Sequence, residues 1–123
     1  MAILPPPDRD SYSTMRNLKW SSTERAIARK AFDRALQQEL DAAIQSTKQM
    51  AAKIRQASEL WELERHLTQL RKEIDRKYEY KYSVLLAVFG ELVRDGRLDV
   101  RNLQGLAEDK LAYIRREATR PAA

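Results

Sequence analysis

The sequence contains no Cys, one His, three Gly and four Pro among 123 residues. Without Cys, the chain cannot form a disulfide scaffold, a thiolate nucleophile or a Cys-based zinc site. One His is too few for a His-rich metal site. The three Gly form neither a GxxxxGKS/T nor a GxGxxG motif, so we expect no phosphate-binding loop. Few Gly and Pro also argue against a β-sandwich, which needs turn residues at every corner.

Long apolar runs and catalytic patterns are missing as well. The longest apolar run covers residues 84–89, whereas a membrane-spanning helix needs about 20 such residues. No apolar segment long enough for a signal sequence precedes Pro5-Pro6-Pro7, which favours a soluble, intracellular protein. Neither G-x-S-x-G nor H-E-x-x-H occurs, and we interpret His66 as an ordinary surface residue. We therefore expect no enzymatic activity.

Charge is abundant but of mixed sign. Asp, Glu, Lys and Arg make up 33% of the chain, and 23 basic residues against 18 acidic ones give a net charge of +5. Interleaved signs are typical of solvated helical surfaces. The basic excess leaves one alternative function, a helical dimer that binds nucleic acid or another acidic partner. The sequence lacks a helix-turn-helix pattern or a basic region before a zipper, which counts against nucleic acid.

Apolar residues recur at steps of three and four after a flexible N-terminal tail at residues 1–19, which predicts helices. Ser21 and Glu24 have the spacing of a capping box, so a first helix is expected from Ser21 to about Gln56. A second helix follows with Ser58 as its N-cap. It carries a heptad seam typical of long helix–helix contacts, made of Leu60, Leu63, Leu67, Leu70 and Ile74.

The last part of the chain predicts a small helical head at residues 83–118. The alternating tyrosines of 78–82 are interpreted as a helix end or hinge, because no second strand is available for pairing. An apolar helix is expected over 84–93, with Ser83 as a candidate N-cap and Gly96 in the left-handed position after it. A final helix is expected over 100–116, before a C-terminal tail at 119–123.

The fold class is therefore all-α, with two long helices over residues 20–82. A compact chain of this length has a radius of gyration of about 14 Å, whereas a helix of 35 residues is about 50 Å long. Two such helices cannot fully cover each other's apolar stripes. We therefore expect an elongated antiparallel homodimer formed through the long helices.

Trp61 lies outside the heptad seam, at position b if Leu60 is at a. Glu64 and Arg65 lie one turn further on, and Arg71 is about 15 Å along the helix. A Trp among charged residues, with an Arg nearby, has the composition of an interface hot spot. The alternative is that Trp61 covers the first helix within the same chain.

The stretch from Leu60-Trp61-Glu62-Leu63 through Arg71-Lys72-Glu73-Ile74-Asp75 to Lys77-Tyr78 resembles the fluorescence recovery protein family of cyanobacteria. The likeness covers about residues 20 to 116. It implies an all-helical, dimeric, non-enzymatic regulator of photoprotection by non-photochemical quenching. Such proteins bind the photoactivated red form of the orange carotenoid protein, mainly its C-terminal domain. They accelerate its reversion to the orange form and its detachment from the phycobilisome, so that antenna fluorescence recovers.

The resemblance also implies a cytoplasmic protein near phycobilisomes, at the cytoplasmic face of the thylakoid. It implies no cofactor, because the carotenoid belongs to the partner, and no nucleic acid. Within the family motif, Trp61 and Arg71 are retained, and Leu60 should belong to the dimer contact.

Other family positions differ in this chain. Glu64-Arg65 stands where the family often has a His-Asp pair. In the head, Ala87 replaces an aromatic residue, with Phe89 nearby, and Tyr113 replaces a basic residue. The partner surface expected from the resemblance thus consists of Trp61, Arg71, Glu64, Arg65 and Phe89.

Overall fold

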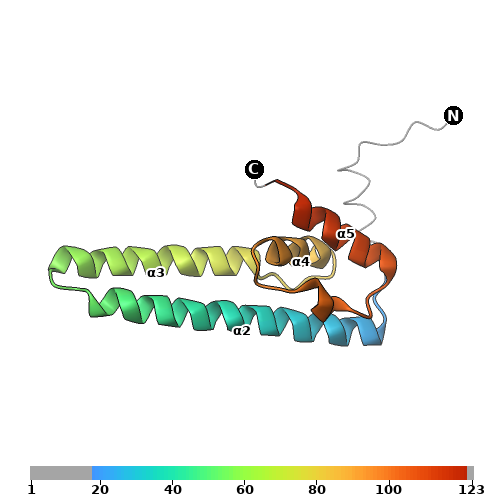
Figure 1. Cartoon of the computed structure of the whole chain (residues 1–123), viewed down its shortest axis with the longest axis horizontal. Helices are drawn as coiled ribbons and strands as arrows, with labels where there is room; N and C mark the ends of the chain where they lie inside the picture. The colour runs from blue at the N-terminus through green and yellow to red at the C-terminus, as the bar shows by residue number, and fades with distance from the viewer. Residues whose placement is uncertain (1–17, 122–123) are drawn as a thin grey trace.

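A helical hairpin forms the long axis of the molecule (Figure 1). The computed structural model describes residues 18–121, and its two long helices are α2 (Ser22–Ala52) and α3 (Ala57–Lys77). They run antiparallel and side by side. The predicted pair of long helices is confirmed, whereas residues 1–17 of the predicted tail lie outside the described residues.

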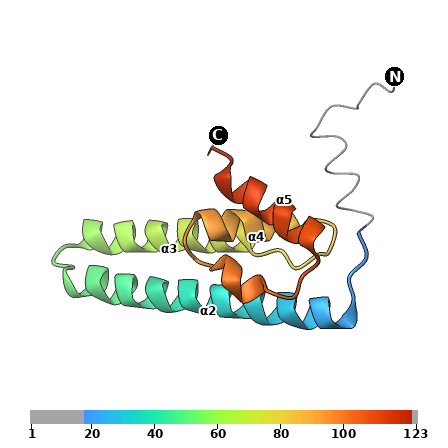
Figure 2. The same ribbon diagram turned by 45° about the vertical axis from the view of Figure 1, so that its right-hand side comes forward.

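The head folds back beside one end of this hairpin (Figure 2). It contains α4 (Leu85–Arg94), the short 3₁₀ helix η1 (Val100–Leu103) and α5 (Glu108–Thr119). The described part of the chain is all-helical, as predicted. None of its helices is both long enough and apolar enough to cross a bilayer.

A capping box starts α2, as the sequence predicts. The Glu24 N–H donates to Ser21 Oγ at 3.0 Å, and the Ser21 N–H donates to Glu24 Oε1 at 3.0 Å. Because each side chain satisfies a backbone donor that the first turn leaves unpaired, the helix begins at Ser22.

The turn between the long helices differs from the prediction. Helix α2 ends at Ala52, not at Gln56, and the N-cap of α3 is Gln56, not Ser58. The carboxylate of Glu59 accepts from the backbone N–H groups of Arg55 and Gln56 at 3.2 and 3.1 Å. Capping of these N–H groups by the Glu59 carboxylate therefore places the start of α3 before Ser58.

The head also departs from the predicted boundaries. Val84, not Ser83, precedes α4. Gly96 has a φ of 76°, which confirms its left-handed position. The single helix predicted over 100–116 is wrong, because Gly105 has a φ of 106° and separates η1 from α5.

The hydrophobic core lies between the head and the N-terminal half of α2. Four core side chains come from α2, namely Ala28, Ala31, Phe32 and Ala35. The head contributes most of the rest, and its largest fully buried side chains are Phe89, Leu85, Leu86, Leu92, Leu103 and Ile114. The far half of the hairpin is different: no residue from 40 to 76 is fully buried. The hairpin end distant from the head therefore has little core of its own.

Two buried lysines, Lys77 and Lys110, form ion pairs where the hairpin meets the head. Lys77 Nζ, at the end of α3, lies 2.8 Å from Glu39 Oε1 on α2 and 3.4 Å from Asp95 Oδ2 after α4. Lys110 Nζ, on α5, lies 3.0 Å from Glu24 Oε2 on α2. The Lys77–Glu39 pair joins the two hairpin helices, whereas the Lys77–Asp95 and Lys110–Glu24 contacts connect the head to the hairpin.

Candidate partner-binding and dimer surfaces

Only some residues of the heptad seam of α3 face α2, and the others are exposed to solvent. Leu63, Leu70 and Ile74 are half-buried, on the side of α3 that also carries Lys77, whose ammonium binds Glu39 of α2. The other two seam residues are exposed, Leu60 at 47% and Leu67 at 41%. The seam is therefore not one uniform surface for a second copy, because α2 already covers part of it within the chain.

Leu67 belongs to an apolar surface that both long helices share. Leu40 and Ile44 on α2 are exposed, and with Leu67 and Leu70 they line a shallow hollow of about 440 Å³. Among its lining residues only Lys48 carries a charge. Soluble monomers rarely leave contiguous apolar surface open to water. We call this surface the hairpin face, consisting of Leu40, Ala43, Ile44, Thr47, Leu67 and Leu70.

Trp61 lies near the closed end of the hairpin, in the second turn of α3. Its side chain is 58% exposed, the largest value among the exposed large hydrophobic residues. The alternative that Trp61 covers α2 is therefore wrong. An indole held in water on a helix is an unfavourable arrangement unless another surface covers it, so Trp61 is available for contact.

Arg71 lies further along α3 and is also accessible. Its side chain is 86% exposed, and its Nε lies 4.0 Å from Asp75 Oδ2, which is a weak, solvent-screened pair. Trp61 and Arg71 are about 15 Å apart along the helix. They do not form a single cluster, so a partner that touches both must lie along α3.

The two other predicted polar residues occupy the same region. Glu64 accepts a hydrogen bond from Thr68 Oγ1 at 3.3 Å. Arg65 is exposed and makes no hydrogen bond or ion pair with the described part of the chain. Both remain open to a partner on the outer surface of α3.

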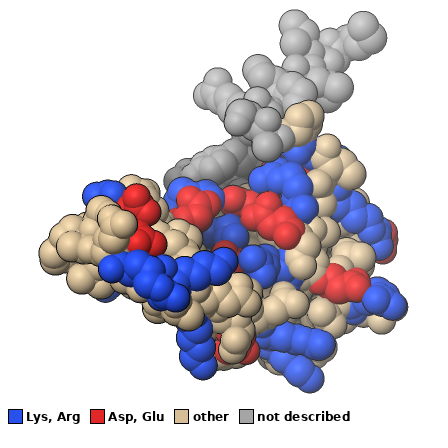
Figure 3. All heavy atoms as spheres, turned by 60° about the vertical axis from the view of Figure 1, so that its left-hand side comes forward, with Lys and Arg blue, Asp and Glu red and all other residues tan. Residues whose placement is uncertain are grey.

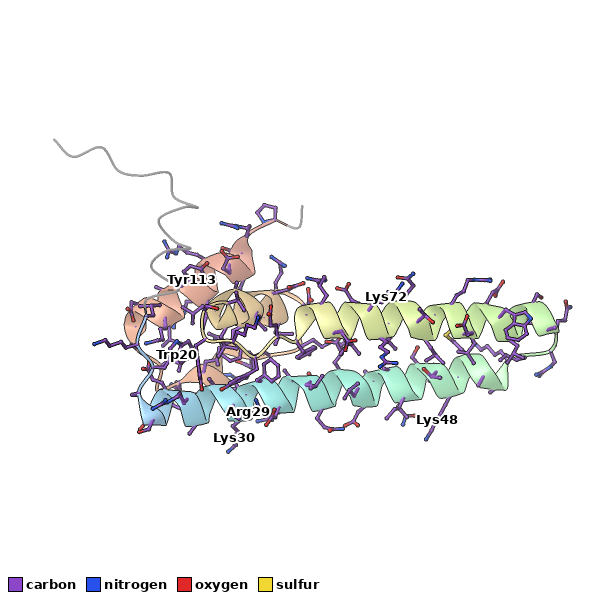
Figure 4. All side chains as sticks on the ribbon, turned by 180° about the vertical axis from the view of Figure 1, so that it is seen from behind. Trp20, Arg29, Lys30, Lys48, Lys72 and Tyr113 are labelled. Carbon is purple, nitrogen blue, oxygen red and sulfur yellow. The ribbon has the colours of Figure 1, made fainter. Side chains whose placement is uncertain are left out.

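Phe89 is not exposed on the surface of the head. This side chain is fully buried in the core, so the prediction that it contacts a partner does not hold for this conformation. Ala87 is half-buried. Tyr113 on α5 is labelled in Figure 4, and the guanidinium of Arg116 lies 5.7 Å from its ring centroid. Arg116 was not among the residues predicted from the sequence, although its position one turn after Tyr113 places it on the same side of α5.

His66 is half-buried on α3, between Leu63 and Leu70 along the helix. Across residues 18–121, no group of three or more His, Asp and Glu side chains could hold a metal ion. The accessible side chains on the outer side of α3 include an indole, a guanidinium group and apolar groups.

Charges of both signs cover the face shown in Figure 3, and Lys and Arg predominate over parts of it. This agrees with the mixed charge pattern of the sequence. It gives the molecule several short basic patches on a surface that also carries acidic groups.

Comparisons with known proteins agree with this architecture. Residues 20–118 match the family model described as photoprotection regulator fluorescence recovery protein. The fluorescence recovery protein of Synechocystis sp. is 36% identical over 96 residues, which cover 78% of this chain and 88% of that protein.

Two solved structures are also similar. That of the Fremyella diplosiphon fluorescence recovery protein aligns with a TM-score of 0.79 at 39% identity. That of the Synechocystis protein aligns with a TM-score of 0.78 at 36% identity. Each alignment covers 81% of this chain and 98% of the other. The match over nearly all described residues, in sequence and in fold, shows that this chain belongs to the fluorescence recovery protein family, whose members are photoprotection regulators.

Proposed function

We propose that this protein binds the photoactivated red form of the orange carotenoid protein, mainly through that protein's C-terminal domain. Binding accelerates reversion to the orange form and detachment from the phycobilisome, so that antenna fluorescence recovers. The observation that carries the proposal is the family match over residues 20–118. The exposure of Trp61 and Arg71 at the matching motif positions supports it.

The action on the partner follows from linkage. A protein that shifts a conformational equilibrium must bind the two forms with different affinity, and one that only speeds relaxation must bind the transition state better. In our proposal, Trp61 packs into an apolar site that becomes accessible when the partner's domains separate. Arg71, about 15 Å away along α3, pairs with an acidic group. Two separated contacts hold the C-terminal domain in one orientation, which favours re-docking of the N-terminal domain.

The head contributes a third contact in this proposal. Tyr113 occupies the family's basic position, but Arg116 lies beside its ring and supplies a positive charge there. We therefore assign the head contact to Tyr113 and Arg116 in place of Phe89, which has no exposed surface.

Replacing Trp61 with Ala is expected to raise the concentration needed for half-maximal acceleration at least tenfold. The reason is that truncating a hot-spot aromatic costs about 2 kcal/mol or more. Arg71→Leu should have a smaller effect in the same direction. The measurement is the red-to-orange relaxation of purified orange carotenoid protein in darkness.

The control is Lys72→Leu, which removes a neighbouring exposed charge on α3. It should leave the relaxation rate within twofold. Helicity and oligomeric state must be unchanged in every variant. If Trp61→Ala and Arg71→Leu both accelerate relaxation as well as the unaltered chain does, the assignment of this surface is wrong.

We also propose that a second copy covers the hairpin face in an antiparallel homodimer. Leu60 and Leu67 are exposed on α3, and Leu40 and Ile44 on α2. No residue from 40 to 76 is fully buried within one chain. Pairing this half of the hairpin with a second copy would remove its apolar side chains from water, at about 25 cal/mol for each Å² buried.

Introducing a charge at Leu60 is expected to produce monomers. In Leu60→Glu, a carboxylate would have to enter an apolar contact without a partner, which is unfavourable. Size-exclusion chromatography with light scattering would show half the dimer mass.

A matched control is Gln69→Glu, which adds the same charge at an exposed position of α3 about 200° from Leu67 around the helix. It should remain dimeric. A dimer that persists in both Leu60→Glu and Leu67→Glu would reject the hairpin face as the interface.

A further inference from the structure

A polar groove lies between α2 and the segment that joins α4 to α5, apart from the surfaces described above. Two adjoining hollows of about 610 and 230 Å³ form it, and both are lined by Arg34 and Asn102. On α2 the lining extends from Ile27 to Asp41. These 14 helical steps span about 21 Å, which is the length of about six residues of extended chain.

Amide side chains line both walls of this groove. Gln38 comes from α2, and Asn102 and Gln104 come from η1 and the residue after it. The side-chain amides of Gln38 and Gln104 form no hydrogen bond within residues 18–121, and Asn102 Oδ1 accepts only from Arg34 Nη1, at 3.5 Å. Each amide can both donate and accept. Such a lining matches an extended peptide backbone, which presents one donor and one acceptor per residue.

The net charge of the groove differs between its two ends, because some of its charged side chains are paired and others are not. Asp99 is neutralised by Arg101 at 2.7 Å, and Arg97 is directed to Glu39 at 3.6 Å. Asp41, at the far end, accepts from Gln37 at 2.9 Å.

At the other end, Lys30 and Arg34 form no ion pair with any residue of 18–121. The groove end at residues 27–34 therefore carries uncompensated positive charge, and a carboxylate placed there would be favoured.

From these observations we propose that this groove binds an extended acidic segment of a partner protein. About six of its residues lie along α2, their peptide groups bonded to Gln38, Asn102 and Gln104. Their carboxylates lie over Lys30 and Arg34. The site is separate from Trp61 and Arg71, so it supplies a second point of attachment to a partner.

The test measures binding of a fluorescein-labelled eight-residue peptide of alternating Glu and Thr to the full chain by fluorescence anisotropy. Arg34→Glu and Lys30→Glu should each weaken binding at least tenfold, because each reverses a charge that faces the carboxylates. Lys72→Glu changes the net charge equally but lies on α3, away from the groove (Figure 4). It should alter affinity less than twofold.

Two further measurements separate a built site from general attraction. The double variant Gln38→Ala, Gln104→Ala leaves the charge unchanged and should weaken binding about threefold. In NMR spectra, the peptide should shift backbone amides of residues 30–41 and 96–104 and leave the Trp61 indole signal in place.

Several results would overturn the proposal. Equal losses in Lys72→Glu and Arg34→Glu would indicate non-specific attraction. Equal binding of a matched eight-residue peptide of alternating Gln and Thr would remove the acidic requirement. Tighter binding of a labelled single-stranded oligonucleotide would assign the groove to nucleic acid. At least tenfold tighter peptide binding after removal of residues 1–17 would assign it to the chain's own N-terminal segment. No carotenoid protein is used, so failure here is distinguishable from failure of the proposed function.

Discussion

Replacing Lys77 with Met is expected to lower the free energy of unfolding by about 3 kcal/mol, because it leaves a buried carboxylate without its main partner. Lys77 is 6% exposed and Glu39 is 7% exposed. Met fills a similar volume, so the loss would report the charge and not a cavity. After the change, Glu39 keeps only the Tyr78 hydroxyl at 2.8 Å and Arg97 at 3.6 Å.

The shift in the pKa of Glu39 has the same origin. Burial raises the pKa of this carboxyl, but hydrogen bonds from Lys77 and Tyr78 and the charge of Lys77 outweigh burial and lower it. Burial and the neighbouring Glu39 raise the pKa of Tyr78, which keeps its hydroxyl a hydrogen-bond donor near neutral pH. In Lys77→Met, the Glu39 carboxyl should therefore have a higher pKa than in the unaltered chain.

Urea unfolding followed by circular dichroism measures this loss. Lys72→Met is the matched control, because Lys72 lies on the same helix but is exposed, and it should cost less than about 0.5 kcal/mol. The double variant Glu39→Gln, Lys77→Met should be more stable than Lys77→Met alone, since it leaves no buried charge. A loss in Lys77→Met no larger than in Lys72→Met would contradict the role given to this ion pair.

Replacing Glu24 with Gln is expected to have the second large effect, again about 3 kcal/mol. Glu24 is 8% exposed and joins two elements. One oxygen accepts from the Ser21 N–H at 3.0 Å, and the other accepts from the Ala107 N–H at 2.9 Å, just before α5. Lys110 Nζ lies 3.0 Å from the carboxylate. The substitution thus weakens the α2 cap and leaves the ammonium of Lys110 buried.

The cost of Glu24→Gln should depend on pH. Burial raises the pKa of Glu24, but the backbone donors of Ser21 and Ala107 and the Lys110 ammonium lower it from 4.5 to about 2. A lowered pKa means that the folded state favours the carboxylate. The stabilisation is complete above about pH 4.5 and is lost as the pH falls toward 2. The difference between the unaltered chain and Glu24→Gln should therefore fall below half its neutral value by about pH 3.

Urea unfolding at several pH values would measure this difference. Lys110 is the only charged side chain among residues 18–121 that forms an ion pair with Glu24. Glu62→Gln, at an exposed position of α3, is the control and should show a small, pH-independent effect. A difference for Glu24→Gln that stays constant between neutral pH and pH 3 would contradict the lowered pKa.

Lys77 and Lys110 matter for the proposed function because their ion pairs link the helices that carry the proposed partner contacts. Lys77 joins α3, which carries Trp61 and Arg71, to Asp95 in the head. Lys110 joins α5, which carries Tyr113 and Arg116, to α2. Loss of either pair should therefore alter the relative position of the hairpin and head contacts before it unfolds the helices.

Local signals predicted the helical elements well. The spacing of Ser21 and Glu24 predicted the start of α2, and Gly96 the end of α4, because caps depend on residues within one turn. Gly105 was overlooked, and the predicted helix over 100–116 therefore crossed a left-handed residue. Heptad spacing identified an apolar stripe on α3, but not which of its residues α2 would cover.

Burial of particular side chains required the tertiary structure. Phe89 and Trp61 are both aromatic residues on helices, yet one is fully buried and the other is 58% exposed. The two buried ion pairs could not be predicted from the sequence, because their members are far apart along the chain. Lys77 and Glu39 are 38 residues apart, and Lys110 and Glu24 are 86 residues apart. The groove between α2 and η1 likewise exists only because distant segments pack together.

Composition and residue spacing were sufficient to predict the all-α class, the two long helices and the motif that indicates the family, since these features depend on residues within a few turns of one another. The tertiary structure decided that the head shares its core with α2, that Phe89 is buried and that Leu60, Leu67 and Trp61 remain open. The physical reason is that exposure depends on which distant helix packs against each face, and the period of a helix does not specify that partner.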